Sequence, residues 1–152
     1  MALAISSVVL GSITGLSVAT NITNTLVISS ITGTYGLVRG FATYHYTQVN
    51  EVIEECDLTA KLEIIEALMY DVSKKDSTDK ESIKKAFNNL DIVVTDINKL
   101  LQKIDLIIKA HKDKYFSNWR TLCYDKEIYE LKRLIRLMDL RYAMFLEILK
   151  IK

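Results

Sequence analysis

The strongest constraint on the fold is an apolar stripe that runs through residues 79–111. Eight side chains recur there at alternating spacings of four and three residues: Ile83, Phe87, Leu90, Val94, Ile97, Leu101, Ile104 and Ile108. This spacing keeps them on one side of an α-helix that is about 50 Å long, at about 1.5 Å per residue. A second line widens the stripe to a face: Ala86, Val93, Leu100 and Ile107. A face this wide predicts a core of several helices rather than a two-stranded coiled coil.

Residues 58–72 have the same helical spacing of apolar side chains: Leu58, Leu62, Ile65, Met69 and Val72. Asp57 precedes them, where a side-chain oxygen can cap a helix start. Val49, Val52 and Ile53 keep a similar rhythm further upstream, which allows this helix to begin well before Asp57.

A last helix is expected from about Asp125, with a stripe of Ile128, Leu131, Ile135, Met138, Tyr142, Phe145 and Leu149. Leu134, Leu137 and Ile148 broaden that stripe. The chain contains no proline, which suits long uninterrupted helices, because proline removes a helix donor and clashes with the preceding turn. The sequence therefore predicts an all-α fold, an antiparallel bundle of three long amphipathic helices.

The start of the chain differs in kind from this bundle. The first 38 residues contain no Asp, Glu, Lys, Arg or His, and all five glycines lie at or before position 40. Small residues recur at helical spacing and are the candidate membrane-contacting or self-packing residues: Ser7, Gly11, Gly15, Ala19, Ser29, Gly33, Gly36 and Gly40. Two G-x-x-x-G motifs result, and small residues four apart let helix backbones approach closely. We expect a Gly/Ser/Thr-rich helical hairpin, over about 3–20 and 25–46.

This contrast divides the chain into an uncharged hydrophobic hairpin, residues 1–46, and an amphipathic helical bundle, residues 47–152. Residues 2–20 are long enough to cross a thin hydrocarbon core. Arg39 and the polar residues 43–47 weaken the second half as a membrane span. Burial of the hairpin in a protein bundle or in an assembly interface is the alternative, so the segment is expected to contact either a membrane or protein.

The segment 111–120 combines aromatic and cationic side chains, including the only tryptophan. Its candidate partner-docking residues are Lys112, Lys114, Tyr115, Phe116, Trp119 and Arg120. Trp and Tyr beside Arg and Lys are typical interface anchors. The alternative is a loop whose aromatic side chains close the end of the bundle. His111 follows the apolar stripe and is expected at the edge of the core, since no second histidine or carboxylate is spaced to assist it.

Composition argues against several classes of protein. The chain has 20 Lys and Arg against 19 Asp and Glu, so a positive field for nucleic acid is not indicated. Two cysteines, Cys56 and Cys123, are too few for a disulfide scaffold or a thiolate zinc site, and whether they pair stays open. The scattered carboxylates lack the Glu-x-x-His pairs of di-metal bundles. We expect no catalytic residues, metal, cofactor or small-molecule substrate, and hence a non-enzyme.

The abundance of Ile, Lys, Asp, Asn and Tyr, together with the amphipathic helices that lead into residues 111–120, resembles small helical proteins of large DNA viruses. That resemblance covers residues 58–150 and implies a structural, virion-associated role. The Gly-rich apolar start followed by an amphipathic bundle also resembles HeLo-type and necroptotic four-helix membrane-permeabilising domains. Here the first segment is longer than in that class and has no early acidic residue, which puts a regulated killing mechanism in doubt.

Three functions follow from these patterns. The first is a non-enzymatic structural protein, membrane-associated or embedded in a homo- or hetero-oligomeric assembly through residues 1–40, located in a virion or at a host membrane. The second is a membrane-permeabilising effector that uses the same hairpin. The third is a soluble, cytoplasmic helical adaptor in which residues 1–40 are core and residues 115–120 bind a protein.

Overall fold

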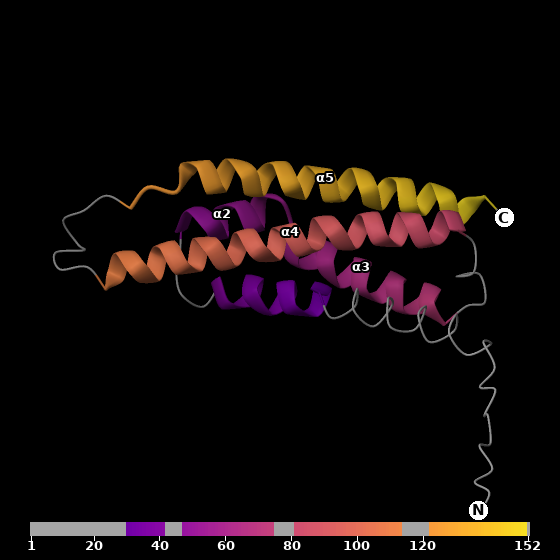
Figure 1. Cartoon of the computed structure of the whole chain (residues 1–152), viewed down its shortest axis with the longest axis horizontal. Coiled ribbons are helices and arrows are strands. Elements are labelled where there is room, and N and C mark those ends of the chain that lie inside the picture. Colours follow the sequence, from indigo (N-terminus) through magenta and orange to yellow (C-terminus); the bar gives the residue numbers. More distant parts are fainter. Residues whose placement is uncertain (1–29, 42–46, 75–80, 114–121, 152) are drawn as a thin grey trace, which may run out of the picture.

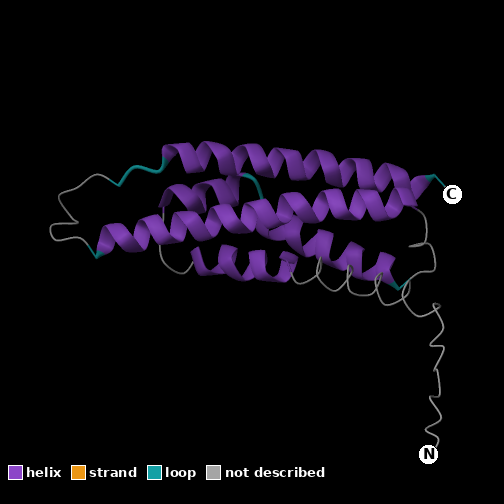
Figure 2. Ribbon diagram, viewed as in Figure 1, coloured by secondary structure: helices purple, strands orange, loops and turns teal. Residues whose placement is uncertain are grey.

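The computed structural model describes residues 30–41, 47–74, 81–113 and 122–151, and these segments are almost entirely α-helical (Figures 1 and 2). Residues 30–41 form one helical segment, here called the 30–41 helix. The others are α2 (Thr47–Glu55), α3 (Leu58–Ser73), α4 (Glu81–Lys112) and α5 (Asp125–Lys150). The described residues contain no strand. The predicted all-α bundle is therefore confirmed.

The three predicted amphipathic helices correspond to α3, α4 and α5, with bounds within about two residues of those expected. The eight side chains of the α4 stripe are all buried, and so are all five of the α3 stripe. The helical spacing of large apolar side chains thus correctly predicted which side of these helices faces the core.

The helices pair as two antiparallel hairpins. In the first, the 30–41 helix runs against α3, since Thr32 contacts Glu66 while Tyr35, further along, contacts the earlier residue Glu63. In the second, α4 runs against α5, as Figure 1 shows and as the Lys103–Glu127 ion pair of 2.9 Å marks near one end. Short connections favour such antiparallel neighbours.

The two hairpins stack so that each helix of one lies beside a helix of the other that runs in the same direction. Ser30 and Thr34 of the 30–41 helix bond to Asp91 and Asn98 of α4, respectively. On the other side, Lys132 of α5 pairs with Glu55 at the end of α2, at 2.9 Å. Lys61 of α3 likewise pairs with Asp139 of α5, at 2.8 Å. The result is a bundle of four helical positions, one of them occupied by α2 and α3 in succession.

One continuous apolar core lies between the hairpins. This core includes an edge-to-face contact between Phe87, near the start of α4, and Phe145, near the end of α5, with ring centroids 5.3 Å apart and planes at 89°. The 30–41 helix contributes Ile31, Val38 and Phe41 to the same core. This helix therefore packs as part of the bundle. The division at residue 46 remains a prediction, because residues 1–29 of the expected hairpin lie outside the described residues.

The connection between α2 and α3 differs from the expected single helix start. Val49, Val52 and Ile53 belong to a separate helix, α2, which ends just before Asp57. Asp57 is left-handed, with φ 49° and ψ 42°, and its side chain makes no capping bond. Its carbonyl oxygen instead accepts the Lys61 N–H at 3.1 Å. The predicted side-chain cap at Asp57 is wrong, because the residue serves as the bend between two helices.

Candidate functional site

The inward side of the 30–41 helix carries a polar group in the core. Thr34 is fully buried, and its hydroxyl donates to the Ser30 carbonyl oxygen at 2.8 Å. The same oxygen accepts from the Asn98 amide nitrogen of α4 at 3.1 Å. Gln102 then donates to the Asn98 amide oxygen at 2.8 Å. Because the buried Thr34 hydroxyl is bonded both as donor and as acceptor, the network fixes the 30–41 helix on α4 at one register.

Three carboxylates hold the edges of the 30–41 helix. Ser30 donates to Asp91 at 2.6 Å on the α4 side. Thr32 donates to Glu66 at 2.5 Å and Tyr35 to Glu63 at 2.6 Å on the α3 side. The hydrogen bond to Glu63, followed by burial, raises the pKa of Tyr35 above its ordinary value. The helix thus supplies neutral hydroxyl donors, and the charged acceptors all belong to its neighbours.

The glycines of the 30–41 helix face in different directions. A Cβ built on Gly33 would lie 3.6 Å from the Asn98 amide nitrogen, in ordinary contact with α4. A Cβ built on Gly36 or Gly40 would have no described atom within 4 Å. We call Gly36 and Gly40 the glycine face. It is directed away from the described helices, so these glycines are not used for close packing within the described chain.

The other residues predicted for membrane contact or self-packing, Ser7, Gly11, Gly15, Ala19 and Ser29, lie outside the described residues. None of the helices in the described ranges is long and apolar enough to cross a membrane. The predicted contact of residues 1–40 with a membrane or with protein remains a prediction.

Only Lys112 of the predicted docking residues is described, and it is exposed at the end of α4. Lys114, Tyr115, Phe116, Trp119 and Arg120 lie outside the described residues. His111 is half-buried beside Lys112, at the edge of the bundle as expected. The two interpretations of this segment, partner docking and closure of the bundle end, both stay open.

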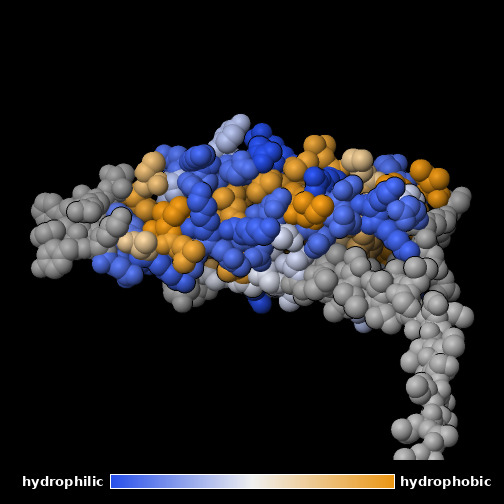
Figure 3. Space-filling view, in the orientation of Figure 1, coloured by the Kyte–Doolittle hydropathy of each residue, from blue (hydrophilic) through white to orange (hydrophobic). Residues whose placement is uncertain are grey.

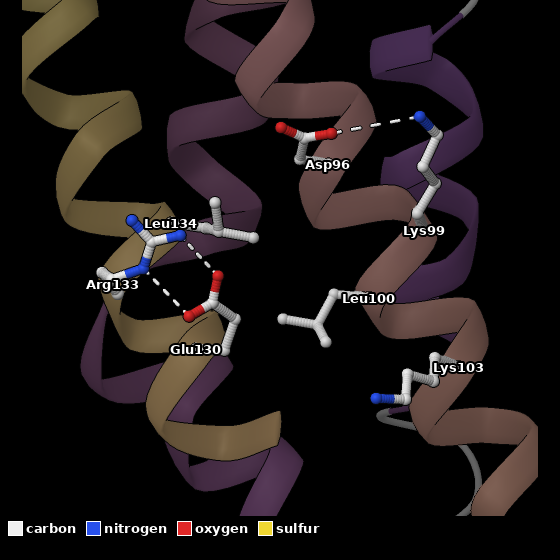
Figure 4. Close-up of a pocket in the computed structure, with 7 residues that line it drawn as sticks. All are labelled: Asp96, Lys99, Leu100, Lys103, Glu130, Arg133 and Leu134. Carbon is white, nitrogen blue, oxygen red and sulfur yellow. Dashed lines mark hydrogen bonds and ion pairs between the residues drawn. The ribbon is translucent and has the colours of Figure 1, made fainter. Parts of the chain in front are cut away.

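A groove of about 300 Å³ runs between α4 and α5 on the face shown in Figure 4. Its walls carry Asp96, Lys99 and Lys103 from α4 and Glu130 and Arg133 from α5. The charges are mostly engaged. Arg133 donates to Glu130 at 2.9 Å through Nε, Lys99 lies 4.0 Å from Asp96, and Lys103 pairs with Glu127 just outside the groove. A shallow groove with paired charges offers no converging set of reactive groups.

Titratable groups in this part of the bundle are shifted in the direction of ion pairing. The hydrogen bond from Arg133 lowers the pKa of Glu130, and the hydrogen bond from Lys103 lowers the pKa of Glu127. Both shifts have a structural cause and none points to an acid or base held ready for proton transfer. Among the described residues, no three His, Cys, Asp or Glu side chains gather where they could hold a metal ion. Cys56 and Cys123 are both free thiols.

One surface was missed by the sequence patterns. Three large apolar side chains of α5 are mostly exposed, Tyr129 at 72%, Leu140 at 65% and Met144 at 61%, and so is Ile151, at 76%, directly after the helix. In the view of Figure 3, hydrophobic patches lie among hydrophilic residues on the surface of the molecule. The sequence signal was available, because these positions lie outside the core stripe of α5 yet carry large apolar residues.

Comparison of the chain with protein-family models found no match, and comparison with curated proteins and with solved structures found none.

Proposed function

We propose that the protein is a non-enzymatic structural subunit, built into a larger assembly through its first 40 residues. The observation that carries the proposal is the orientation of the 30–41 helix. Its inner side is bonded to α3 and α4, whereas Gly36 and Gly40 present bare backbone away from the described helices. Bare backbone on a fixed helix is a surface on which a second helix packs closely.

The charge distribution supports the same proposal. Every charged residue of the chain lies from Arg39 onward, and those in the described helices lie on the surface or in ion pairs. Transfer of an uncharged segment of this length out of water lowers the free energy of the system, by about 25 cal/mol for each Å² of apolar surface buried. We propose that the glycine face packs against the same segment in other copies of the chain. Contact with a membrane is the alternative that the experiment below distinguishes. The resemblance to proteins of large DNA viruses would make the assembly part of a virion.

The glycine face can be blocked without strain in the described chain. Gly36→Leu with Gly40→Leu adds side chains where no described atom lies within 4 Å, and it replaces two poor helix formers. A matched control adds the same bulk elsewhere, as Ala67→Leu with Ala110→Leu, since both alanines are exposed on other helices.

Sedimentation of the full chain in detergent-free buffer tests the proposal. The wild type and the alanine control should exceed the 17.4 kDa of one chain, and the glycine variant should have a smaller mass than both. Equal masses for the glycine variant and the control would refute assembly through this face. Flotation with lipid vesicles is measured in parallel. If the glycine variant loses vesicle binding while its mass is unchanged, the segment contacts a membrane instead of copies of itself.

A further inference from the structure

The exposed apolar side chains of α5 belong to a longer row. Arg133, Arg136 and Glu147 are exposed between them and complete it. From Tyr129 to Glu147 the row advances by four, three, four, four and three residues, and Ile151 follows four residues later, one position past the end of α5. This spacing averages close to 3.6, so the row stays on one side of α5 from Tyr129 to Glu147, over about 27 Å at about 1.5 Å per residue. We call this side the α5 row.

We propose that the α5 row is an interface between two copies of the chain, in which α5 packs antiparallel on α5 about a two-fold axis at Leu140. A two-fold interface requires a surface that is complementary to itself, so that each residue meets the right partner in both copies. The α5 row fulfils this requirement in its apolar and its charged positions.

The pairing can be followed outward from Leu140, which meets the partner's Leu140 on the axis. Arg133 and Glu147 lie seven residues before and seven residues after Leu140. Arg133 of one copy therefore faces Glu147 of the other. Tyr129 and Ile151 are each eleven residues away and form an apolar pair at both ends. Arg136 and Met144 are each four residues from Leu140, so Arg136 faces the partner's Met144. This places Arg136 about one helical turn from the partner's Glu147.

Charge selects this arrangement over others. A parallel pair in the same register would place Arg133 against Arg133 and Glu147 against Glu147, and like charges across an interface cost several kcal/mol. In the antiparallel pair, each Glu147 lies near two arginines of the partner. Among the described residues, Arg133 and Glu147 form ion pairs with residues three positions away on their own helix, Glu130 and Lys150. Such exposed pairs contribute little, so they exchange readily for pairs between copies.

The α5 row is accessible in the described structure. The core side of α5, which includes Phe145 and Leu131, packs on α4 and α2. The α5 row lies on the opposite side of the helix and is exposed to solvent. A single pair of helices buries less than the 1,200 to 2,000 Å² of a standard interface. We therefore expect a weak, reversible dimer. The interface is separate from the glycine face and does not rest on the function proposed above.

Charge reversal tests the pairing. Arg133→Glu or Glu147→Arg alone should weaken dimerisation about tenfold or more, because each creates like charges across the axis. The double variant, Arg133→Glu with Glu147→Arg, should restore the affinity to within about threefold of the wild type. Glu81→Lys with Lys85→Glu is the control, since it reverses an exposed pair of α4 that lies off the row. Sedimentation equilibrium measures the dissociation constant of each full-length variant in the Gly36→Leu, Gly40→Leu background, which removes the other contact.

A cross-link tests the axis. In a chain with Cys56→Ser and Cys123→Ser, Leu140→Cys should oxidise to a disulfide-linked dimer, because the two thiols meet at the axis. Ile64→Cys, on α3 and also more than half exposed, should stay largely monomeric under the same conditions. Single charge reversals that leave the dissociation constant unchanged, a double variant that is not restored, or equal cross-linking at both positions would each overturn the proposal. A failure of the glycine-face experiment would leave these results unaffected.

Discussion

Thr34, fully buried on the 30–41 helix, accepts a hydrogen bond of 3.1 Å from the side chain of Asn98 in the middle of α4. The two residues are 64 positions apart in the chain. This bond joins a segment of almost no charge to the longest amphipathic helix, and it determines which side of the 30–41 helix looks outward.

Thr34→Val should destabilise the bundle by about 1–2 kcal/mol. The two side chains have nearly the same shape, so the change removes the hydroxyl and leaves the Asn98 amide without its buried acceptor. Urea unfolding followed by circular dichroism measures the free energy. Thr95→Val, a half-buried position on α4, is the control and should change stability by less than about 0.5 kcal/mol. Equal effects at both positions would contradict the role of the Thr34–Asn98 bond.

Phe145→Ala should cost about 3–5 kcal/mol, because it empties a fully buried position of the core and removes the edge-to-face contact with Phe87. Leu106→Ala removes a side chain that is mostly exposed on α4 and should cost much less. Both are measured by the same unfolding experiment. A cost below about 1 kcal/mol for Phe145→Ala would mean that the hairpins do not pack as described.

Asp57→Val should lower the stability by about 1–2 kcal/mol, because a β-branched residue is strongly disfavoured at φ 49°. Asp57→Gly should leave it unchanged or slightly higher, because glycine adopts this conformation without steric cost. Thermal unfolding midpoints compare the two variants. If valine and glycine gave the same midpoint, the bend between α2 and α3 would not be left-handed.

The Lys103–Glu127 pair predicts a pH dependence. The hydrogen bond from Lys103 lowers the pKa of Glu127 in the folded chain, so the carboxylate stabilises the fold above its unfolded pKa of about 4.3. That contribution is lost as the pH falls through the lower, folded pKa. Lys103→Met should therefore have a lower melting temperature than the wild type at pH 7, and the difference should shrink toward zero near pH 2. A difference that persists in acid would have another origin.

The sequence predicted the parts of the fold that depend on large apolar residues at helical spacing. The stripes of α3, α4 and α5 point to the core almost without exception, because burial of such side chains dominates helix packing. The position of the 30–41 helix was not predictable in this way. It depends on Thr34, Asn98 and Asp91, which are residues typical of a solvated surface, and only their contact with each other makes them part of the interior.

The break at Asp57 and the α5 row show two other limits of periodicity. Apolar residues before Asp57, such as Val52 and Ile53, and after it, such as Leu62, keep a helical spacing, so the pattern gives no sign of the bend. In α5, Leu140 and Met144 are as apolar as the core residues, and spacing alone does not say whether a second copy or the same chain covers them. The candidate surfaces therefore came from exposure and orientation, which the sequence does not specify.

Amide hydrogen exchange along the 30–41 helix tests most directly that this segment is held on the bundle with its glycine face outward. We expect the amides of Val38 and Phe41 to exchange with protection comparable to those of Leu90 and Leu101 in α4, because they open only when the shared core opens. In Thr34→Val, protection of Val38 and Phe41 should fall before that of α4. Exchange of Val38 and Phe41 at the rate of an unstructured peptide would contradict the account.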